Sequence, residues 1–211
     1  MPILWLIIAV SYLLGSIPFG YVLVRIVRGE DVRQSGSGNI GATNVSRTSP
    51  ALGVLTLVLD ACKGAAAVML AAYFAARMHA PSTSLSMSLA ALFATLGHMF
   101  PIWLKFRGGK GVATALGSFV VIAPKAVLVA GAAFAVTVSL FRYVSLGSIL
   151  AVLAFPFLVV IFHEYDNRWL ALGCMSLVSL FIIGKHQANI RRLLHGTENR
   201  LGSKRFTGTR Q

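Results

Sequence analysis

Long apolar segments separated by short polar loops run through almost the whole sequence. Only 12% of the 211 residues are charged, about half the share found in soluble domains. An apolar stretch of about 20 residues is long enough to cross a bilayer as a helix. We therefore expect an all-α integral membrane protein, a single domain over residues 1–211, with seven transmembrane helices near 2–27, 51–75, 85–103, 112–123, 126–141, 144–162 and 169–184.

Single residues predict several helix boundaries. Pro18 predicts a kink in the first segment, because proline cannot complete the helical hydrogen bonds. Ser49 followed by Pro50 is typical of a helix start. The fourth segment, 112–123, is short for a span, which predicts a helix whose polar start lies inside the protein.

Basic residues gather on alternate loops. The formal net charge is +13, a balance that in a soluble protein would suggest a nucleic-acid partner. Membrane proteins concentrate Lys and Arg in cytoplasmic loops, and we favour that explanation and expect no nucleic acid. This places the N-terminus outside and the C-terminus in the cytoplasm. The cytoplasmic side then carries the basic tail and Arg25, Arg28, Arg33, Arg47, Lys105, Arg107, Lys110, Arg142 and Lys185, against Arg77, Lys125 and Arg168 outside.

The first cytoplasmic loop contains a glycine-rich stretch, Gln34–Asn44, with the sequence QSGSGNIGATN. Glycines expose backbone N–H groups beside hydroxyl and amide side chains, an arrangement that binds phosphate in many proteins. A flexible turn between helices explains the loop equally well on its own. If the loop binds an oxyanion, we expect the contacts to come from Ser35, Ser37, Gly38, Asn39, Gly41, Thr43 and Asn44, with Arg47 as the counter-charge.

A second basic and glycine-rich stretch, Lys105–Thr114, opens the fourth apolar segment. The N-terminus of a helix attracts anions, so this stretch also favours phosphate binding. It is not a Walker A motif, because no Ser or Thr follows its central lysine. Anchoring of the loop by positive charge would explain the basic residues but not the three glycines. The candidate residues are Gly108, Gly109, Lys110, Gly111 and Thr114.

The third polar stretch is Lys185–Glu198, with the sequence KHQANIRRLLHGTE. His186, Asn189 and Arg192 recur every three residues and therefore share one face of a helix. An imidazole, an amide and a guanidinium can together hold a phosphate and orient a hydroxyl. A juxtamembrane helix that binds anionic lipid head groups is the alternative, which we favour for this stretch taken alone.

Two charges interrupt the second apolar segment. Asp60 and Lys63 lie three residues apart on one helical face, and we expect them to pair, with a supporting role in a polar cavity as the alternative. His98, at the end of the third segment, is expected to form a helix-end hydrogen bond. His163 and Glu164 have no partners elsewhere in the sequence that would complete a metal site, so we expect no metal ion.

The sequence also lacks the GxSxG pattern of α/β-hydrolases and the HExxH pattern of zinc enzymes. We expect no cofactor. A small membrane transporter of phosphorylated metabolites is the alternative function, because polar loops and intramembrane charges suit transporters as well. Transporters often contain inverted repeats and bind their substrates near the membrane midplane. No internal repeat is evident here, and the three polar stretches share one face of the membrane.

The polar stretches together resemble the motifs of the bacterial acyl-phosphate:glycerol-3-phosphate acyltransferases in order, spacing and overall chain length. The sequences that carry this resemblance are SGSGNIGATN, GHMFP followed by FRGGKGVAT, and HQANIRRLLHGTE, together with GSIPFG and LDACKG in the first two apolar segments.

The resemblance implies a multi-pass enzyme of the bacterial cytoplasmic (inner) membrane whose active site faces the cytoplasm. Such an enzyme would transfer a fatty acyl group from acyl phosphate to the 1-hydroxyl of glycerol 3-phosphate. The products would be lysophosphatidic acid and inorganic phosphate, in the first step of phospholipid synthesis. Neither acyl-CoA nor acyl carrier protein would be the donor, which agrees with the absence of the HxxxxD pattern of other glycerolipid acyltransferases.

The expected reaction assigns roles to the candidate residues. Both substrates carry phosphate, so two anion-binding stretches are needed, and the acyl chain would enter from the lipid bilayer. His186, Asn189 and Lys110 would be catalytic: Lys110 neutralises phosphate, and His186 and Asn189 hold glycerol 3-phosphate and orient its hydroxyl. Asn189 is not a conventional base, so either His186 or a substrate phosphate would accept the proton. Arg192 and Glu198 would brace the site.

Overall fold

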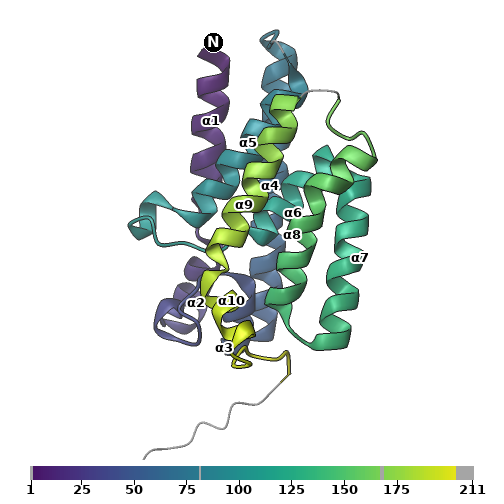
Figure 1. Ribbon diagram of the computed structural model, residues 1–211. Coiled ribbons are helices and arrows are strands. Elements are labelled where there is room, and N and C mark those ends of the chain that lie inside the picture. Colours follow the sequence, from purple (N-terminus) through teal and green to yellow (C-terminus); the bar gives the residue numbers. More distant parts are fainter. Residues whose placement is uncertain (1, 81, 167–168, 203–211) are drawn as a thin grey trace, which may run out of the picture.

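The computed structural model describes residues 2–80, 82–166 and 169–202, and over these ranges the chain is a helical bundle without β-strands (Figure 1). The helices, in chain order, are α1 (Pro2–Gly15), α2 (Phe19–Arg28), η1 (Val32–Gln34), α3 (Ala42–Thr48), α4 (Pro50–Arg77), α5 (Thr83–Met99), η2 (Ile102–Leu104), α6 (Val112–Ile122), α7 (Pro124–Phe141), α8 (Val144–Ile161), α9 (Trp169–Lys185) and α10 (Gln187–Leu194).

Fewer helices reach membrane-spanning length than the sequence predicted. Within the described residues, five stretches are long and apolar enough to span: 2–28, 50–77, 83–104, 124–141 and 144–161. A sixth exists if α9 and α10, bent by 55° to each other, are taken as one span. All seven predicted segments are helical, but α6 has only 11 residues because Gly111 precedes its first turn and Pro124 begins the next helix.

The predicted kink in the first segment is confirmed as a break between α1 and α2, with Pro18 immediately before α2. Lys63 in α4 compensates for this break, since its Nζ donates to the carbonyl of Ile17, 2.7 Å away. The predicted helix start at Ser49 is also confirmed: its hydroxyl accepts from the amide of Leu52, and Pro50 is the first residue of α4.

Small residues let the central helices pack closely. A Cβ on Gly15 would overlap the backbone of Ala94, so only glycine allows α1 to approach α5. A Cβ on Gly117 would likewise overlap the backbone of Ala61, where α6 crosses α4. Membrane helices often use small residues in this way, because lipid provides no hydrophobic force that drives helices together.

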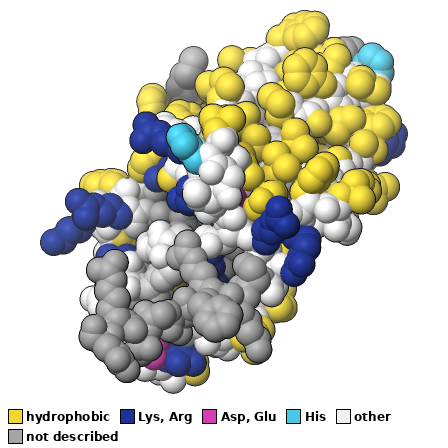
Figure 2. Space-filling view, turned by 60° about the horizontal axis from the view of Figure 1, so that its bottom comes forward, with side chains coloured by type: hydrophobic (Ala, Val, Ile, Leu, Met, Phe, Trp, Pro, Cys, Tyr) yellow, Lys and Arg dark blue, Asp and Glu magenta, His cyan; other side chains and the backbone are white. Residues whose placement is uncertain are grey.

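The charged and apolar surfaces are separated. Large apolar side chains on the outer helices are exposed, among them Leu128 on α7 and Phe157 on α8, as expected for a flank in contact with lipid. Figure 2 looks towards the end of the bundle that carries α2, α3 and α10. Lys and Arg side chains surround this end, whereas hydrophobic side chains cover much of the visible flank. We call it the basic end.

Candidate active site

The first loop (Gln34–Asn44) is organised by the side chain of its last residue. Asn44 is 2% exposed, and its Oδ1 accepts from the amide of Ser37 at 2.8 Å. Its Nδ2 lies within 3.1 Å of the carbonyls of Val32, Ser35 and Asn39. These contacts occupy both polar atoms of the Asn44 side-chain amide. We expected Asn44 to contact phosphate, but in this structure its side chain holds the backbone of the first loop in shape.

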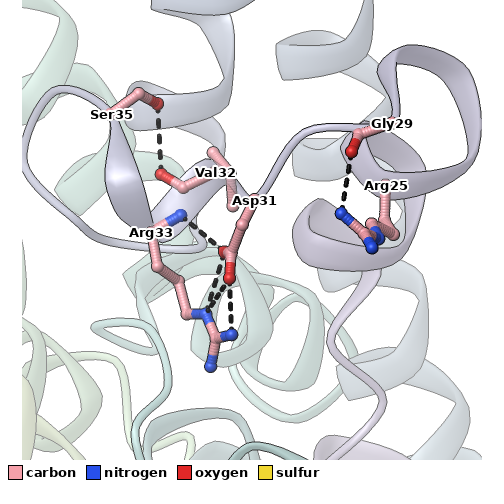
Figure 3. A network of polar contacts seen from close by, with 6 residues as sticks. All are labelled: Arg25, Gly29, Asp31, Val32, Arg33 and Ser35. Carbon is pink, nitrogen blue, oxygen red and sulfur yellow. Dashed lines mark hydrogen bonds and ion pairs between the residues drawn. The ribbon is translucent and has the colours of Figure 1, made fainter.

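An ion pair fixes the start of the loop (Figure 3). The Asp31 carboxylate caps η1 by accepting from the amide of Arg33, and the Arg33 guanidinium returns to the same carboxylate at 2.6 Å. Hydrogen bonding from Arg33 holds the pKa of Asp31 below its usual value, although burial opposes the shift. The hydroxyl of Ser35 donates to the Val32 carbonyl at 3.2 Å, so Ser35 also supports the local turn.

The loop leaves several polar groups available. Gly36 and Gly38 have φ angles of +57° and +70°, a left-handed conformation that favours glycine. Within the described residues, the hydroxyls of Ser37 and Thr43 and the guanidinium of Arg47 make no hydrogen bond, and all three side chains are on exposed residues. The Asn39 carboxamide oxygen accepts from the Gly41 amide at 2.8 Å. The loop can therefore offer two hydroxyls and one cation to an anion.

The glycines of the second segment (Lys105–Thr114) allow this segment to pack closely against the end of α5, which the sequence did not reveal. The amides of Gly108 and Gly109 donate to the carbonyls of Met99 and His98 at the end of α5, at 3.1 and 3.0 Å. A Cβ on Gly109 would overlap the His98 ring, and Gly111 has a φ angle of +85°. Those two amides are thus engaged by protein, and the glycines bring Lys110 close to α5.

Thr114 was expected to contact phosphate, but its position does not support that role. The first turn of α6 directs this residue into the bundle, where it is fully buried against α4. Its hydroxyl oxygen has no hydrogen-bond partner among the described residues. Lys110 lies in the segment that precedes α6 and is only half-buried, whereas Thr114 is buried inside the bundle.

Lys110 lies in a hydrogen-bonded chain that joins the second and third stretches. Its Nζ donates to Oδ1 of Asn189 at 2.6 Å, and Nδ2 of Asn189 donates to Glu198 at 2.7 Å. The other oxygen of Glu198 accepts from Nε of Arg192, also at 2.7 Å, and Ser145 on α8 donates to this carboxylate at 2.9 Å. Asn189 and Arg192 thus share one helical face, as predicted, and Glu198 links them.

The charges around Lys110 affect its protonation. The pKa of Lys110 is lowered to about 8, mainly by burial; Glu198 opposes this shift, and the cations Arg192 and Arg47 add to it. The influence of Arg47 places the first loop close to the second segment. Burial raises the pKa of Glu198, but hydrogen bonds from Asn189, Arg192 and Ser145 outweigh it and leave that pKa below its usual value.

His186 occupies the break between α9 and α10 and is 2% exposed. Its Nδ1 lies 2.8 Å from the carbonyl of Ile182. A carbonyl only accepts, so Nδ1 carries the hydrogen, and in the neutral ring Nε2 is an acceptor. Burial lowers the pKa of His186 to about 4, and the nearby Lys110 cation acts in the same direction. The imidazole is therefore neutral at pH 7.

The expected pair between Asp60 and Lys63 is confirmed, and His98 joins it. Lys63 Nζ lies 2.7 Å from Oδ1 of Asp60 and 3.1 Å from Nδ1 of His98, with all three side chains buried. The other side of the His98 ring faces Gly109. His98 was predicted only as a helix-end hydrogen bonder, because the sequence could not place it against α4.

The acidic group considered for a metal site at the opposite end of the bundle has a structural role. Glu164 accepts from the amides of Lys125 and Ala126, so it caps the start of α7. No group of three or more His, Cys, Asp or Glu residues with metal-binding geometry occurs within the described ranges.

Sequence reasoning missed one residue of the site. Ser145 donates to Glu198 across 53 positions of the sequence. Its only local signal is that it lies in the first turn of a helix on the predicted cytoplasmic side. Nothing in the sequence indicates that the tail folds back to that turn.

Comparisons with known proteins agree over most of the chain. The sequence model of a family described as glycerol-3-phosphate acyltransferase matches residues 5–196. The glycerol-3-phosphate acyltransferase of Syntrophotalea carbinolica is 49% identical over 197 residues, which cover 93% of this chain and 96% of that protein. The protein of the same name from Brucella canis is 47% identical over 196 residues, covering 92% of this chain and 91% of its own.

Two crystal structures of PlsY (YgiH), an integral membrane glycerol 3-phosphate acyltransferase, have the same fold. The glycerol 3-phosphate form has a TM-score of 0.84 and 35% sequence identity, and it covers 94% of this chain and 96% of its own. The lysophosphatidic acid form has a TM-score of 0.80 and 34% identity, with 94% and 95% covered. The resemblance inferred from the motifs is confirmed: the chain belongs to the glycerol-3-phosphate acyltransferase family.

Proposed function

We propose that this protein transfers a fatty acyl group from acyl phosphate to the 1-hydroxyl of glycerol 3-phosphate, releasing lysophosphatidic acid and inorganic phosphate. Family membership supports the acceptor, and the related PlsY structures are named for their glycerol 3-phosphate and lysophosphatidic acid forms. The observation that carries the proposal is the position of Lys110, a half-buried cation beside the polar face of Asn189 and a neutral imidazole at His186.

Phosphate recognition rests on two cations and two hydroxyls. Lys110 is paired with an amide oxygen, so a phosphate can approach it without displacing a bound carboxylate. Arg47 has no ion-pair partner in the described part of the chain, and Ser37 and Thr43 add donors from the first loop. We assign Asn44 and the three glycines of the second segment to shaping these surfaces, because their polar contacts are made within the protein.

The acceptor hydroxyl is placed by His186 and Asn189. With Nδ1 donating to the Ile182 carbonyl, Nε2 of His186 can accept the hydrogen of a substrate hydroxyl. A neutral base with a low pKa is a weak proton acceptor. The phosphate that leaves a doubly charged acyl phosphate carries three negative charges before it is protonated and is a much stronger acceptor. We therefore assign His186 to orienting the hydroxyl and the leaving phosphate to taking the proton.

The reaction balances without a cofactor. The hydroxyl oxygen attacks the acyl carbonyl carbon and forms the ester bond, while the bond between that carbon and the phosphate oxygen breaks. Phosphate leaves with the electron pair and gains the hydroxyl proton, so hydrogen phosphate is the second product. Because phosphate is a good leaving group, the protein needs mainly to position the reactants and to stabilise charge.

The membrane arrangement follows the distribution of charge. We propose that the basic end faces the cytoplasm, with the chain in the bacterial inner membrane and its N-terminus outside, because Lys and Arg concentrate in cytoplasmic loops. In this arrangement α6 counts as the short member of seven transmembrane segments, and the acyl chain of the donor enters from the lipid flank. The transporter alternative has no support from the family match.

The choice of acyl donor tests this proposal. Purified protein in lipid should release inorganic phosphate from acyl phosphate only when glycerol 3-phosphate is present, with one lysophosphatidic acid formed for each phosphate. Acyl-CoA and acyl carrier protein carrying the same acyl chain should give no product. Equal or faster acylation from acyl-CoA would overturn the assignment of the donor, while the family membership would stand.

A further inference from the structure

The α7–α8 hairpin lies at the edge of the bundle, and its turn is at the basic end, close to the chain that follows α10 (Figure 1). α7 packs mainly on α8, and α8 in turn packs on α9. Within the described residues, neither Arg142 nor Tyr143 of this turn forms a hydrogen bond or ion pair with Lys110, His186 or Asn189. The turn is nevertheless joined to them through the tail.

Arg142 binds both backbone polar groups of one tail residue, Leu201. Its Nε and Nη2 donate to the carbonyl of Leu201 at 3.0 and 2.7 Å, and the amide of Leu201 donates back to the Arg142 carbonyl at 2.6 Å. A Cβ on Gly202 would lie 3.0 Å from Nη2, so the chain passes close against the guanidinium. Arg142 itself has a φ angle of +63°, a conformation that needs support from surrounding contacts in a non-glycine residue.

The next residues of the turn contact the tail as well. The hydroxyl of Tyr143 accepts from Nε of Arg200 at 3.1 Å, and that guanidinium lies over the Tyr143 ring at 5.5 Å from its centroid. Ser145 donates to Glu198 at 2.9 Å. Residues 142, 143 and 145 thus contact residues 201, 200 and 198, so two short segments run past each other in opposite directions with three side-chain contacts between them. We name this contact the tail clasp.

Glu198 connects the tail clasp to Lys110. Its side chain is only 7% exposed and accepts from Asn189, Arg192 and Ser145. Two of these partners are on α10, and one is on α8. A carboxylate on a segment without helical structure keeps such a position only if the segment is tied down, because chain ends are otherwise poorly ordered. Arg142 provides the tie by binding Leu201, three residues beyond Glu198.

We infer that Arg142 is a positioning residue for acyl transfer, which acts by holding the tail so that Glu198 keeps Asn189 and Lys110 in place. This inference rests on the proposed function, because the effect of Arg142 is measured as a rate of acyl transfer. Arg142 does not touch the substrate. Without the clasp, Glu198 is free to hydrate, Asn189 loses the acceptor for its Nδ2, and Lys110 loses the nearby negative charge.

A simpler role for Arg142 is as one of the basic residues that orient the protein in the membrane. Arg191, an exposed arginine on α10, is a matched control, since Arg191→Ala removes the same charge from the same end without touching the clasp. Arg142→Lys provides a second comparison. It keeps the charge, but one ammonium group cannot reproduce a two-nitrogen contact with one carbonyl.

The experiment compares Arg142→Ala, Arg142→Lys, Tyr143→Phe and Arg191→Ala with the unsubstituted protein in lipid. We expect Arg142→Ala to lower kcat/KM for glycerol 3-phosphate by about tenfold, Arg142→Lys to restore it in part, and Tyr143→Phe to lower it less. Arg191→Ala should be unchanged. Hydrogen exchange of a peptide containing Leu201 should accelerate most in Arg142→Ala, less in Arg142→Lys and Tyr143→Phe, and not at all in Arg191→Ala.

A pH profile separates positioning from a general loss of structure. Glu198, Arg192 and Arg47 act on the pKa of Lys110, and only Glu198 raises it. Displacing Glu198 should therefore move the alkaline decline of activity to lower pH in Arg142→Ala. Equal activity in Arg142→Ala and Arg191→Ala would overturn the inference, as would faster exchange at Leu201 with an unchanged rate and profile. Absence of acyl transfer by the unsubstituted protein would instead refute the proposed function.

Discussion

Lys110 combines a positive charge with partial burial, and its closest polar partner is neutral. The amide oxygen of Asn189 lies 2.6 Å from its Nζ, whereas the carboxylate of Glu198 is linked to it through Asn189. A phosphate that reaches Lys110 would thus form the first direct ion pair of this ammonium group among the described residues. Asp60 and Lys63 show the contrasting case, because they neutralise each other inside the bundle.

The protonation of Lys110 predicts an alkaline limit to activity. Its pKa of about 8 means that the free enzyme loses this charge above that pH, so kcat/KM for glycerol 3-phosphate should fall about tenfold per pH unit beyond it. Lys110→Arg keeps its charge, because a guanidinium does not deprotonate in proteins. The decline should then disappear, even if the rate at neutral pH is lower. The same decline in the arginine variant would show that another group is responsible.

His186 provides a second prediction for a single residue. His186→Asn can still donate to the Ile182 carbonyl but has no acceptor at the position of Nε2. If the hydroxyl is oriented by Nε2, kcat should fall by about 100-fold, within the usual range for loss of a positioned acid–base group, while the protein remains folded. Steady-state kinetics and a melting curve would measure both. A near-normal kcat would exclude His186 from hydroxyl orientation.

At the scale of helices and loops, the sequence predicted which three polar stretches form the candidate site. It did not predict which contacts each residue of these stretches makes. The motif pattern indicated the first loop, the second segment and the face of α10. It could not show that Asn44 binds its own loop or that the Gly108 and Gly109 amides donate to α5. Such contacts depend on which carbonyls the fold places nearby, and short-range sequence spacing carries no information about them.

The packing of the second segment on α5 predicts the effect of one methyl group. Gly109→Ala places a Cβ where the His98 ring lies, so the segment must move away from α5 and take Lys110 with it. A shift of this kind misplaces a catalytic group and should lower kcat/KM by about 100-fold. Gly131→Ala in α7 is the control, because its Cβ would meet open space. Equal activity of the two variants would contradict this account of the glycine.

For the whole molecule, the sequence predicted an all-α membrane protein with its functional groups at one end. The helical class and the membrane character are supported by the fold and by the family. The predicted count of seven spans is not reached by length within the described residues, because α6 is short and α9 ends before His186, where the chain bends into α10. The short apolar length of 112–123 already predicted a helix whose polar start lies inside the protein, where other helices replace contact with lipid.

The orientation of the bundle can be tested in intact cells. With Cys62 and Cys174 replaced by serine, Met78→Cys should react with a membrane-impermeant thiol reagent, because this exposed position is at the end that we place outside. Arg191→Cys, at the basic end, should react only after the membrane is permeabilised. The reverse pattern would contradict the proposed sidedness.

The central claim is that one anion site, with Lys110 at its centre, carries acyl transfer between two phosphate-bearing substrates. The most direct test measures phosphate release from acyl phosphate that depends on glycerol 3-phosphate, in two purified variants from the same segment. Lys110→Gln should lower this rate by at least about 100-fold, as expected for loss of a charge-stabilising donor. Lys105→Gln, at an exposed position, should stay within about threefold of the unsubstituted protein. Near-normal release by Lys110→Gln would contradict the claim.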